Sequence, residues 1–506
     1  ISSKMFLLLL GTLVALVIVH FVLKDLKIYH KYGHIPGPKG LPVIGNLHQI
    51  DRLKPWLTVS NWAKDYGPVM KVNFLGQIVV ICNTFESVRD MLDTKGKEFG
   101  GRERGYRSQM VTESSGFMRM DVQNPDWRLS RRLLHSSIKA FGPGLSRIEH
   151  YAQEMSEEFV RRFKGSNGKP VDPLSPIYDT TLGMISLMIY GRKLDPNSEI
   201  FHSIKAMANL TNEAFHVGKD GMQLEHFPFM RFFGNHTYKI LKIAKEHVYK
   251  IWNWYKDEIA PMEDADLDDN LGKPYMKVIR DYNKTCAPEE RISDMNMMGN
   301  GAHVMFAGVL TTTTTLYELI LVLLHYPEKH KKMMKEIEEV IGSRTPTLND
   351  RNHMPYMNAV LTEIMRFGSV GPLGITHRSV YDSDILGTKI PKDSQVMPNM
   401  YLVHYDKEIF GDPEVFRPER YLDKTGELLP ADDIVWKHTI PFGMGPRVCA
   451  GMMFAQYRIF LWTCILYQRF DIQTDPNHPL SSCDIKTFEL NGLSLICKPY
   501  KAKFIP

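Results

Sequence analysis

The sequence has little cysteine and no strong excess of charge of either sign. Its 506 residues include six cysteines, none of them in a C-x-x-C pair, which argues against a disulfide scaffold and a zinc cluster. The 62 basic and 57 acidic residues leave a net charge of +5, without the concentrated basic face of a nucleic-acid-binding protein. The 36 glycines and 30 prolines are ordinary numbers and exclude collagen-like and low-complexity classes. A large globular protein remains as the class, and one of its cysteines is a candidate for a special chemical role.

The first apolar run covers residues 5–23. As a helix it would span roughly 28 Å at about 1.5 Å per residue, close to the thickness of a bilayer core. Three lysines follow by residue 31 and only Lys4 precedes, so the positive-inside rule leaves the rest of the chain in the cytoplasm. A cleaved signal peptide is the alternative, but no small-residue cleavage site follows the run. We expect residues 1–34 to form a retained anchor with a basic flank.

Residues 35–48 are rich in proline and glycine, which predicts a stiff, bent hinge between the anchor and the body. Residues 49–506 contain no repeats and no second composition regime, and we expect them to form one large domain. The pattern is mostly helical from about 85 to 340, with short strand-like pieces between about 375 and 405. The fold class expected is mostly α with small β-sheets. The best-defined elements are helices over 293–325, 355–366 and from Cys449 to about 468, and a hairpin over 488–496 around Asn491-Gly492.

One cysteine stands in an unusual setting, at the end of the string Pro441-Phe-Gly-Met-Gly-Pro-Arg-Val-Cys-Ala-Gly451. A glycine-rich loop ends at Cys449 and a helix begins directly after it, so peptide N–H groups and the helix dipole favour a thiolate there. The glycines let a flat ligand approach the backbone, and Arg447 can reach an anionic group on that ligand. A thiolate of this kind can ligate haem iron. A lone cysteine is more often a buried structural residue, but the whole string makes that reading improbable.

The string resembles the F-x-x-G-x-R-x-C-x-G signature of the cytochrome P450 family at Phe442, Gly445, Arg447, Cys449 and Gly451. Other segments resemble further marks of the family in the same order: W-x-x-x-R at Trp127 and Arg131, the oxygen-binding stretch of the central helix at Ala307, Gly308, Thr311 and Thr312, E-x-x-R at Glu363 and Arg366, and the second arginine of that motif at Arg420. The resemblance covers the whole chain. It is nearest to the animal microsomal group of drug- and steroid-metabolising enzymes.

The resemblance implies the cytochrome P450 fold, with haem b as cofactor and Cys449 as the axial ligand of its iron. Buried propionates need charge-assisted donors, and the family pattern gives that work to Trp127, Arg131, His377 and Arg447. Phe442 would pack beside the sulfur, although an ordinary core position is the alternative for it.

On the opposite side of the haem, the family pattern implies that the central helix faces bound oxygen. Ala307 and Gly308 would let the backbone approach that oxygen. Thr311 would donate a hydrogen bond to it, with Thr312 as the second candidate. Most threonines of the run 311–315 are expected to bond back to helix carbonyls.

Glu363, Arg366 and Arg420 are expected to form a buried structural triad rather than a catalytic group. Glu363 and Arg366 lie three apart on one helix face, and an isolated pair of this kind is usually a weak surface contact. Arg420 makes the pair a candidate for a buried triad, in which every charge must be paired. Removing one partner of such a buried ion pair costs about 3–5 kcal/mol. The triad would fix the loop that delivers Cys449.

Two positions depart from the family pattern. Leu310 stands before the key threonine, where an acidic residue is frequent, so proton delivery lacks a carboxylate there. Ser115 stands where relatives often have an arginine for a propionate, and Arg104 is a candidate to replace it.

The substrate pocket is expected to be apolar, and its polar candidate is His303. His303 lies four residues before Ala307 and either faces the pocket or, as the more frequent case, packs as a hydrogen-bonded histidine. The pocket candidates are Phe117, Met118, Met120, Ala302, His303, Phe306, Val370, Leu373, Gly374 and Leu490. The aromatic stretch 226–233 is a candidate for contact with membrane lipid, with core packing as the alternative.

The function expected from these residues is that of a haem-thiolate monooxygenase in the endoplasmic reticulum membrane, acting on a lipophilic steroid, lipid or xenobiotic-like molecule. The chain has no nucleotide-binding fingerprint, so electrons from NADPH would come through a separate flavoprotein reductase, with cytochrome b5 as a further candidate partner. The candidate residues for docking the reductase are Arg131, Arg132 and Lys139. The alternatives are a haem-thiolate isomerase or dehydratase, which Leu310 favours, and a non-enzymatic haem-binding carrier or sensor.

Overall fold

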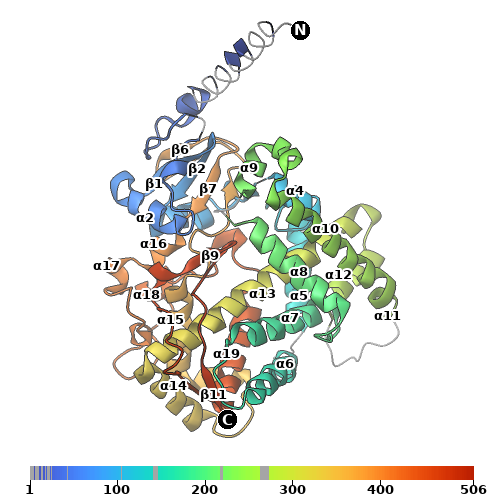
Figure 1. Cartoon of the computed structure of the whole chain (residues 1–506), viewed down its shortest axis with the longest axis vertical. Coiled ribbons are helices and arrows are strands. Elements are labelled where there is room, and N and C mark those ends of the chain that lie inside the picture. The colour runs from blue at the N-terminus through green and yellow to red at the C-terminus, as the bar shows by residue number, and fades with distance from the viewer. Residues whose placement is uncertain are drawn as a thin grey trace. The chain divides into compact units, whose positions relative to one another are not determined.

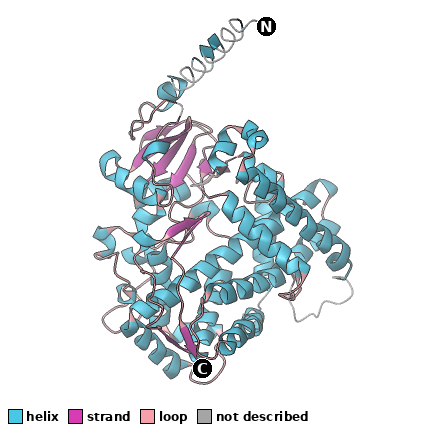
Figure 2. Cartoon of the chain, viewed as in Figure 1, coloured by secondary structure: helices cyan, strands magenta, loops and turns pink. Residues whose placement is uncertain are grey.

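A computed structural model describes residues 5, 11–12, 15–16, 19, 23, 26–42, 44–103, 105–140, 146–216, 220–262 and 273–506. Within it the chain forms two compact units. The first comprises Ile1–Glu103 and Leu373–Val403, and the second Arg104–Pro372 and His404–Pro506. Helices dominate and the strands form only small sheets (Figure 2), which confirms the predicted fold class.

The first unit is built around a five-stranded sheet with strand order β1-β2-β7-β4-β3. β1 and β2 form an antiparallel hairpin, β7 runs parallel to β2, and β4 is antiparallel to both β7 and β3. Its strands are β1 Val69–Phe74, β2 Gln77–Cys82, β3 Gly101–Arg102, β4 His377–Arg378 and β7 Gln395–Pro398, with a separate hairpin of β5 Ser383–Ile385 and β6 Thr388–Ile390. Its helical segments are η1 Leu47–Gln49, α2 Pro55–Tyr66, α3 Phe85–Arg89 and η2 Asp90–Thr94, and α16 Met400–His404 follows β7.

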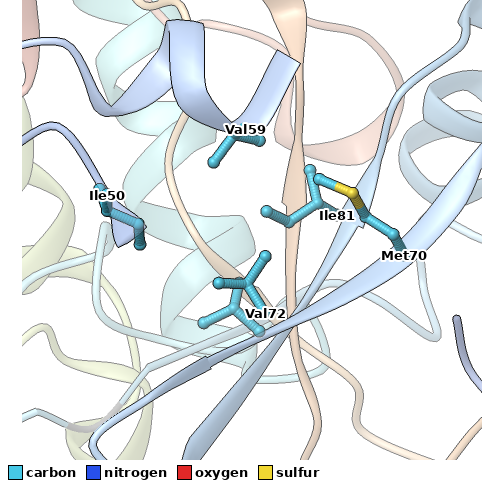
Figure 3. Close-up of a cluster of buried hydrophobic side chains, with 6 residues drawn as sticks. Ile50, Val59, Met70, Val72 and Ile81 are labelled. Atoms are coloured by element: carbon cyan, nitrogen blue, oxygen red, sulfur yellow. The ribbon is translucent and has the colours of Figure 1, made fainter. Parts of the chain in front are cut away.

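An apolar cluster fixes the register of β1 against β2. Met70 and Val72 are alternate residues of β1 and therefore point to the same face of the sheet. They lie directly opposite Ile81 and Val79 of β2. Val59 of α2 and Ile50 pack onto this face (Figure 3), and all these side chains are buried. The cluster gives the first unit its own core.

The proline- and glycine-rich segment lies along β1. The amide of Lys71 donates to the carbonyl of Pro36 at 2.7 Å, and the amide of Asn46 donates to the carbonyl of Asn73 at 2.7 Å. Gly45, with φ of +57°, pairs with Phe74 as an isolated bridge. The described part of this segment is therefore an extension of the sheet. Its predicted role as a hinge to the anchor stays a prediction, because most residues of the run 5–23 lie outside those described.

The second unit is mostly helical (Figure 1). Its longer helices are α4 Tyr106–Thr112, α5 Pro125–Ala140, α6 Ser146–Gly165, α7 Leu174–Tyr190, α8 Glu199–Ala214, α10 His236–Trp254, α12 Tyr275–Thr285, α13 Asp294–His325, α14 Pro327–Val340, α15 Pro355–Gly368 and α19 Met452–Arg469. The shorter segments are α9 Gly221–His226, η3 Pro228–Phe233, η4 Tyr255–Ile259, α11 Ala260–Met262, η6 Pro288–Glu290, η7 Leu348–His353, α17 Lys407–Phe410, η8 Pro418–Tyr421, α18 Ile434–His438, η9 Gly445–Arg447 and η10 Ile485–Thr487. The strands β8 Asp471–Gln473 and β11 Lys503–Ile505 pair with each other, as do β9 Glu489–Asn491 and β10 Ser494–Ile496.

Helix α13 is the axis of this unit, running through its middle (Figure 1) and packing against α7, α8, α15 and α19. Its start is set by Ser293, whose side chain accepts a hydrogen bond from the amide of Asn296, and it ends at His325, before Pro327. The predicted helix over 293–325 is confirmed. So are the helices α15 and α19, and the hairpin β9–β10, where Gly492 takes a φ of +67°.

Among the described residues, one helical run, Pro288–His325, is long and apolar enough to cross a membrane, and 72% of its most apolar stretch is buried in the protein. Burial on this scale is what the core helix of a globular domain shows. We therefore assign this run to the core of the second unit.

Candidate active site

The loop before α19 holds Cys449 in place by hydrogen bonds within its own backbone. Gly443 and Gly445 adopt φ of +68° and +67°, where a side chain would be strained. The amide of Cys449 donates to the carbonyl of Phe442 at 2.9 Å and closes the loop. The Cys449 thiol lies directly before the N-terminus of α19 and is reached by solvent.

The groups around Cys449 have opposite effects on the pKa of its thiol. Although the residue is exposed, the protein atoms around its sulfur desolvate the thiol in part, and this raises the pKa of the thiol. The backbone of Gly451 and the charges of Arg131 and Arg458 act in the other direction and favour the thiolate. A metal ion would add to that effect, because a coordinating thiol is deprotonated.

Helix α5 presents a stripe of three side chains to the cysteine loop. Trp127, Arg131 and His135 recur every four residues and so share one face. The guanidinium of Arg131 donates to the carbonyl of Val448 at 2.8 Å, and His135 bonds to the backbone of Ala450. The stripe therefore holds the two residues on either side of Cys449.

The same stripe brings positive charge together beside the loop. The guanidinium carbons of Arg131 and Arg447 lie 5.2 and 5.0 Å from the centroid of the Trp127 ring. Arg447 also donates to the carbonyl of Met120. The Nε1 of Trp127 is buried and has no acceptor among the described residues. Two guanidinium groups and an indole N–H thus lie beside the cysteine loop, where they could donate to an anion, and a cysteine thiolate is a soft ligand that suits iron. This donor set fits the haem that the sequence implies, with its iron and its carboxylates.

One face of α13 continues the site. Asn296, Asn300, His303, Ala307 and Thr311 follow one another at spacings of three or four and line this face.

The N-terminal part of that face holds the segment that carries Phe117. Asn300 accepts from the amide of Phe117 at 2.8 Å, and Asn296 accepts from the amide of Gly116 at 3.3 Å. A Cβ at Gly116 would lie 2.6 Å from the backbone of Gly299, so the two segments can approach this closely only because both residues are glycine. The buried Phe117 is thereby held against α13.

His303 lies next to Gly116 in this contact. Its Nδ1 is buried and has no hydrogen-bond partner among the described residues. Burial, followed by the charge of Arg119, lowers the pKa of His303 to about 3, so the ring is neutral at pH 7.

The two threonines singled out by sequence have different surroundings. Thr311 is exposed, and its hydroxyl donates to the carbonyl of Ala307 at 2.8 Å. Thr312 is 1% exposed, and its hydroxyl accepts a hydrogen bond from Arg458 of α19 at 2.9 Å. A ligand can reach the hydroxyl of Thr311, whereas that of Thr312 is engaged in helix packing.

Gly308 has a close packing neighbour on α7. A Cβ at this position would lie 2.5 Å from Cδ1 of Ile185, so Gly308 faces α7. Its missing side chain lets α7 and α13 pack closely, and its role in the approach to bound oxygen stays a prediction. The carbonyl of Gly308 accepts from Arg458 at 3.4 Å.

The predicted pocket residues do not all face one space. Ala302 lines a small apolar cavity among α7, α8, α10, α12 and α13, together with Met298, Met305 and Met207. Its place in the substrate pocket stays a prediction. The carbonyl of Val370 accepts from the amide of Leu495 at 2.8 Å, so Val370 adjoins the hairpin that carries Leu490. Met118, Met120 and Phe306 are half-buried.

Some predicted residues belong to the first unit or lie outside the described chain. His377 of β4 is buried, and its Nδ1 bonds to the carbonyl of Phe99 at 2.7 Å. Leu373 and Gly374 also belong to that unit. The roles of these three toward haem or substrate stay predictions. Arg104 is not among the described residues, and the buried Ser115 bonds to the carbonyl of Thr112 at 2.5 Å.

Glu363 of α15 binds both arginines of the expected triad in the interior. Arg366 makes two hydrogen bonds of 2.8 Å to its carboxylate, and Arg420 makes one of 3.0 Å. The side chains of Glu363 and Arg366 are 0% exposed and that of Arg420 3%. The remaining donors of the arginines bind carbonyls, including those of His404 and Phe410 at 2.7 and 2.6 Å.

His404 connects the triad to the cysteine loop. Its carbonyl accepts from Arg366, and its Nε2 accepts from the amide of Ile440 at 3.2 Å. Burial and the charge of Arg366 lower the pKa of His404 to about 3, which keeps Nε2 an acceptor. The carbonyl of Ile440 in turn accepts from the amide of Gly443 in the loop. An unbroken path of hydrogen bonds thus runs from Glu363 to the segment that ends in Cys449.

Sequence reasoning missed three residues of this site: His135, His404 and Arg458. The spacing of four from Trp127 and Arg131 is a signal that could have found His135. No local pattern distinguishes His404, which acts through a contact made in the folded chain. Arg458 falls on the buried side of α19, where a cation is unexpected.

Comparison with known proteins gives a consistent result. The family model described as Cytochrome P450 matches residues 35–504. Similar curated proteins include Cytochrome P450 2B15 of Rattus norvegicus, which is 29% identical over 94% of both chains. Cytochrome P450 2C8 of Homo sapiens is 29% identical over 93% of this chain and 94% of its own. Steroid 17-alpha-hydroxylase/17,20 lyase of Rana dybowskii is 28% identical over 93% of this chain and 90% of its own.

Replacing Glu363 by Gln leaves two buried guanidinium groups without their carboxylate. We expect Glu363→Gln to lower the free energy of unfolding by about 3–5 kcal/mol, measured by denaturant titration. The matched control is Glu157→Gln, because Glu157 is 65% exposed and its ion pair with Arg469 is long, at 3.8 Å. That change should cost less than about 1 kcal/mol. Equal effects of the two substitutions would contradict a supporting role for the buried triad.

Proposed function

The chain belongs to the cytochrome P450 family of haem-dependent monooxygenases, and we propose that it inserts one oxygen atom of O₂ into a lipophilic small molecule with electrons from NADPH delivered by a separate flavoprotein reductase. The observation that carries the proposal is the Cys449 loop. Its thiol stands beside Arg131, Arg447 and the unpartnered indole N–H of Trp127.

The residues of this chain divide the work between two sides of the site. Bound haem supplies the iron at which O₂ is reduced and its O–O bond is cleaved. Cys449 would hold the iron, and Trp127, Arg131 and Arg447 would bind the carboxylates. On the other side Thr311 can relay protons, since its Oγ1 is exposed and can exchange its bond to the carbonyl of Ala307 for one to water. Leu310 offers no carboxylate, so Thr311 carries more of this relay.

A lipophilic substrate accords with the apolar side chains beside α13. Phe117, Phe306 and Leu490 offer apolar surface, and His303 is a neutral polar group among the candidates. Few polar groups would orient such a molecule, as is usual in apolar pockets. The relative from Rana dybowskii acts, by its name, on steroids. For this chain we propose a steroid, a lipid or a xenobiotic-like molecule as the class of substrate.

Attachment to the endoplasmic reticulum membrane is proposed from residues 5–23 and from the η3 segment. Phe229, Phe232 and Phe233 are 55%, 73% and 73% exposed. Three exposed phenylalanines on one short segment favour lipid contact over the core packing that was the alternative. The catalytic part would lie in the cytoplasm, with the basic residues after the apolar run at the membrane surface.

A reductase, or cytochrome b5, would dock near the cysteine loop. Of the three docking candidates, Arg132 and Lys139 are exposed. Arg131 is half-buried and bonded to Val448, so it belongs to the loop rather than to a docking surface.

A screen of lipophilic compounds against the purified ferric protein tests the proposal as a whole. Ligands that enter the site should shift the haem absorption band, and the compounds that do so should give oxygenated products only with NADPH, reductase and O₂. Product formation without NADPH would favour the isomerase or dehydratase alternative. Binding without any turnover would favour the carrier or sensor alternative.

Cys449→Ala should abolish the thiolate-type absorption band of the reduced carbon monoxide complex, because no other side chain replaces the ligand. Cys464→Ala is the matched control, since Cys464 is fully buried on α19, and it should leave the band unchanged. The measurement is the reduced difference spectrum with carbon monoxide. Retention of the band in Cys449→Ala would end the haem-thiolate assignment.

Thr311→Ala should raise the hydrogen peroxide released per NADPH consumed and lower product yield, because protons then arrive late at the reduced oxygen. A general acid–base contribution of this kind is typically worth about 10²–10⁴-fold. Thr313→Ala is the control, as Thr313 is 2% exposed and lies on the same helix. Peroxide and product are measured together during turnover. Unchanged coupling in Thr311→Ala would show that protons take another route.

Deletion of residues 1–23 should reduce membrane association and leave the haem spectrum intact. Residual binding to vesicles should fall further when Phe232 and Phe233 are changed to Ser, because both are exposed. Sedimentation with liposomes measures the association. Loss of haem after the deletion would show that the anchor is not separable from the catalytic part.

A further inference from the structure

Arg458 is a cation enclosed in the protein interior. It lies on α19, nine residues after Cys449, and is 1% exposed. Its guanidinium carbon lies 4.4 Å from the ring centroid of Phe454 and 5.7 Å from that of Trp462. The side chain leaves α19 and ends at α13, where Nη2 donates to Oγ1 of Thr312 at 2.9 Å and to the carbonyl of Gly308 at 3.4 Å.

No carboxylate pairs with Arg458 among the described residues. Its hydrogen-bond acceptors are a hydroxyl and two carbonyls, and its Nη1 has none within the described chain. Arg366 is equally buried, but it is bound to Glu363 in two places. A buried charge without an opposite charge destabilises the fold, and a methionine of similar size would fill the space without that cost.

Cys449, directly before α19, is the group whose negative charge would act on Arg458. Burial lowers the pKa of Arg458 to about 9, and Cys449 acts in the opposite direction. Arg458 in turn favours the thiolate of Cys449. The cation is thus compensated in the state in which Cys449 carries a negative charge.

We propose that Arg458 is the buried counter-charge of the Cys449 thiolate and also a clamp that fixes α13 at Gly308 and Thr312. It is a positioning residue: it touches the helix that carries Thr311 and acts on the iron ligand through space. This inference rests on the proposed function, because it needs Cys449 to be the thiolate ligand.

The charge and the clamp have separable consequences. A positive charge close to the iron stabilises the form that holds one more electron, so removing it should make reduction of the ferric haem harder. Loss of the hydrogen bonds to Thr312 and Gly308 should loosen α13 without changing the charge.

Four variants of the full-length, haem-loaded protein distinguish these effects. Arg458→Met removes both charge and clamp, Arg458→Lys keeps the charge, and Thr312→Val removes the acceptor alone. Arg469→Met is the matched control, since Arg469 lies at the end of α19 and is 49% exposed. The readouts are the ferric–ferrous midpoint potential and amide hydrogen exchange of peptides that cover 305–315.

We expect Arg458→Met to have a more negative midpoint potential and faster exchange in 305–315. Arg458→Lys should retain a potential near that of the unmodified protein, and Thr312→Val should show faster exchange with an unchanged potential. Arg469→Met should change neither. An equal potential in Arg458→Met and Arg469→Met, or an equal shift in Arg458→Met and Arg458→Lys, would overturn the counter-charge.

Exchange in 305–315 that is unchanged in both Arg458→Met and Thr312→Val would overturn the clamp. If Arg458→Met does not fold, Arg458→Gln tests the counter-charge alone, because it keeps a donor near Thr312 without the charge, and Thr312→Val then tests the clamp. The unmodified protein separates the two proposals. Absence of a thiolate-type spectrum there refutes the proposed function, whereas its presence with unshifted variants refutes this inference alone.

Discussion

Glu363 is a carboxylate with no exposure to water, and the segment that carries Cys449 depends on the two arginines it binds. The cost of burying three charges is met only because almost every donor has an acceptor: the carboxylate takes three of them, and the backbone around 404–415 takes the others. That backbone, in which α17 is the only helix after His404, is thereby held in place. His404 extends the order to Ile440, and the loop closed by Phe442 and Cys449 follows. Cys449 lies on a loop, but hydrogen bonds that lead back to helix α15 hold this loop in place.

Three other buried or half-buried arginines lie around the same loop, and two of them, Arg131 and Arg458, are not bound to a carboxylate among the described residues. Arg131 and Arg447 flank Trp127 and bind carbonyls, while Arg458 binds a hydroxyl and carbonyls. A region with this excess of positive charge is unfavourable in a low-dielectric interior unless anions enter it. A thiolate and the carboxylates of a haem are anions of the required kind. The charge distribution is therefore an independent argument for an anionic, iron-binding cofactor, in addition to the loop sequence.

The elements of the second unit could be predicted where local chemistry sets their ends. Ser293 and Pro327 bound α13, Asn491-Gly492 turns the β9–β10 hairpin, and the spacing of Glu363 and Arg366 gives the pair on α15. The rotation of α13 could not be predicted in the same way. This helix is apolar on most faces, so its periodicity does not say which side faces which neighbour. The packing neighbours of Ala302 and Gly308 on α7 and α8 are therefore visible only in the folded chain.

The threonine run shows how one helix can combine rigidity with a free hydroxyl. Consecutive residues of a helix point about 100° apart, so Thr311 and Thr312 cannot serve the same face. Thr312 is turned to α19 and bound by Arg458, while Thr315 bonds back to the carbonyl of Thr311. β-Branched residues are poor helix formers, and these tertiary and local bonds offset that preference. With its neighbours fixed, Thr311 is the one member of the run that is exposed, and its hydroxyl is held only by the carbonyl of Ala307. A single bond of that kind is easily exchanged for water, so the rigidity supplied by Thr312 and Arg458 keeps Thr311 in position for the proton relay that we propose.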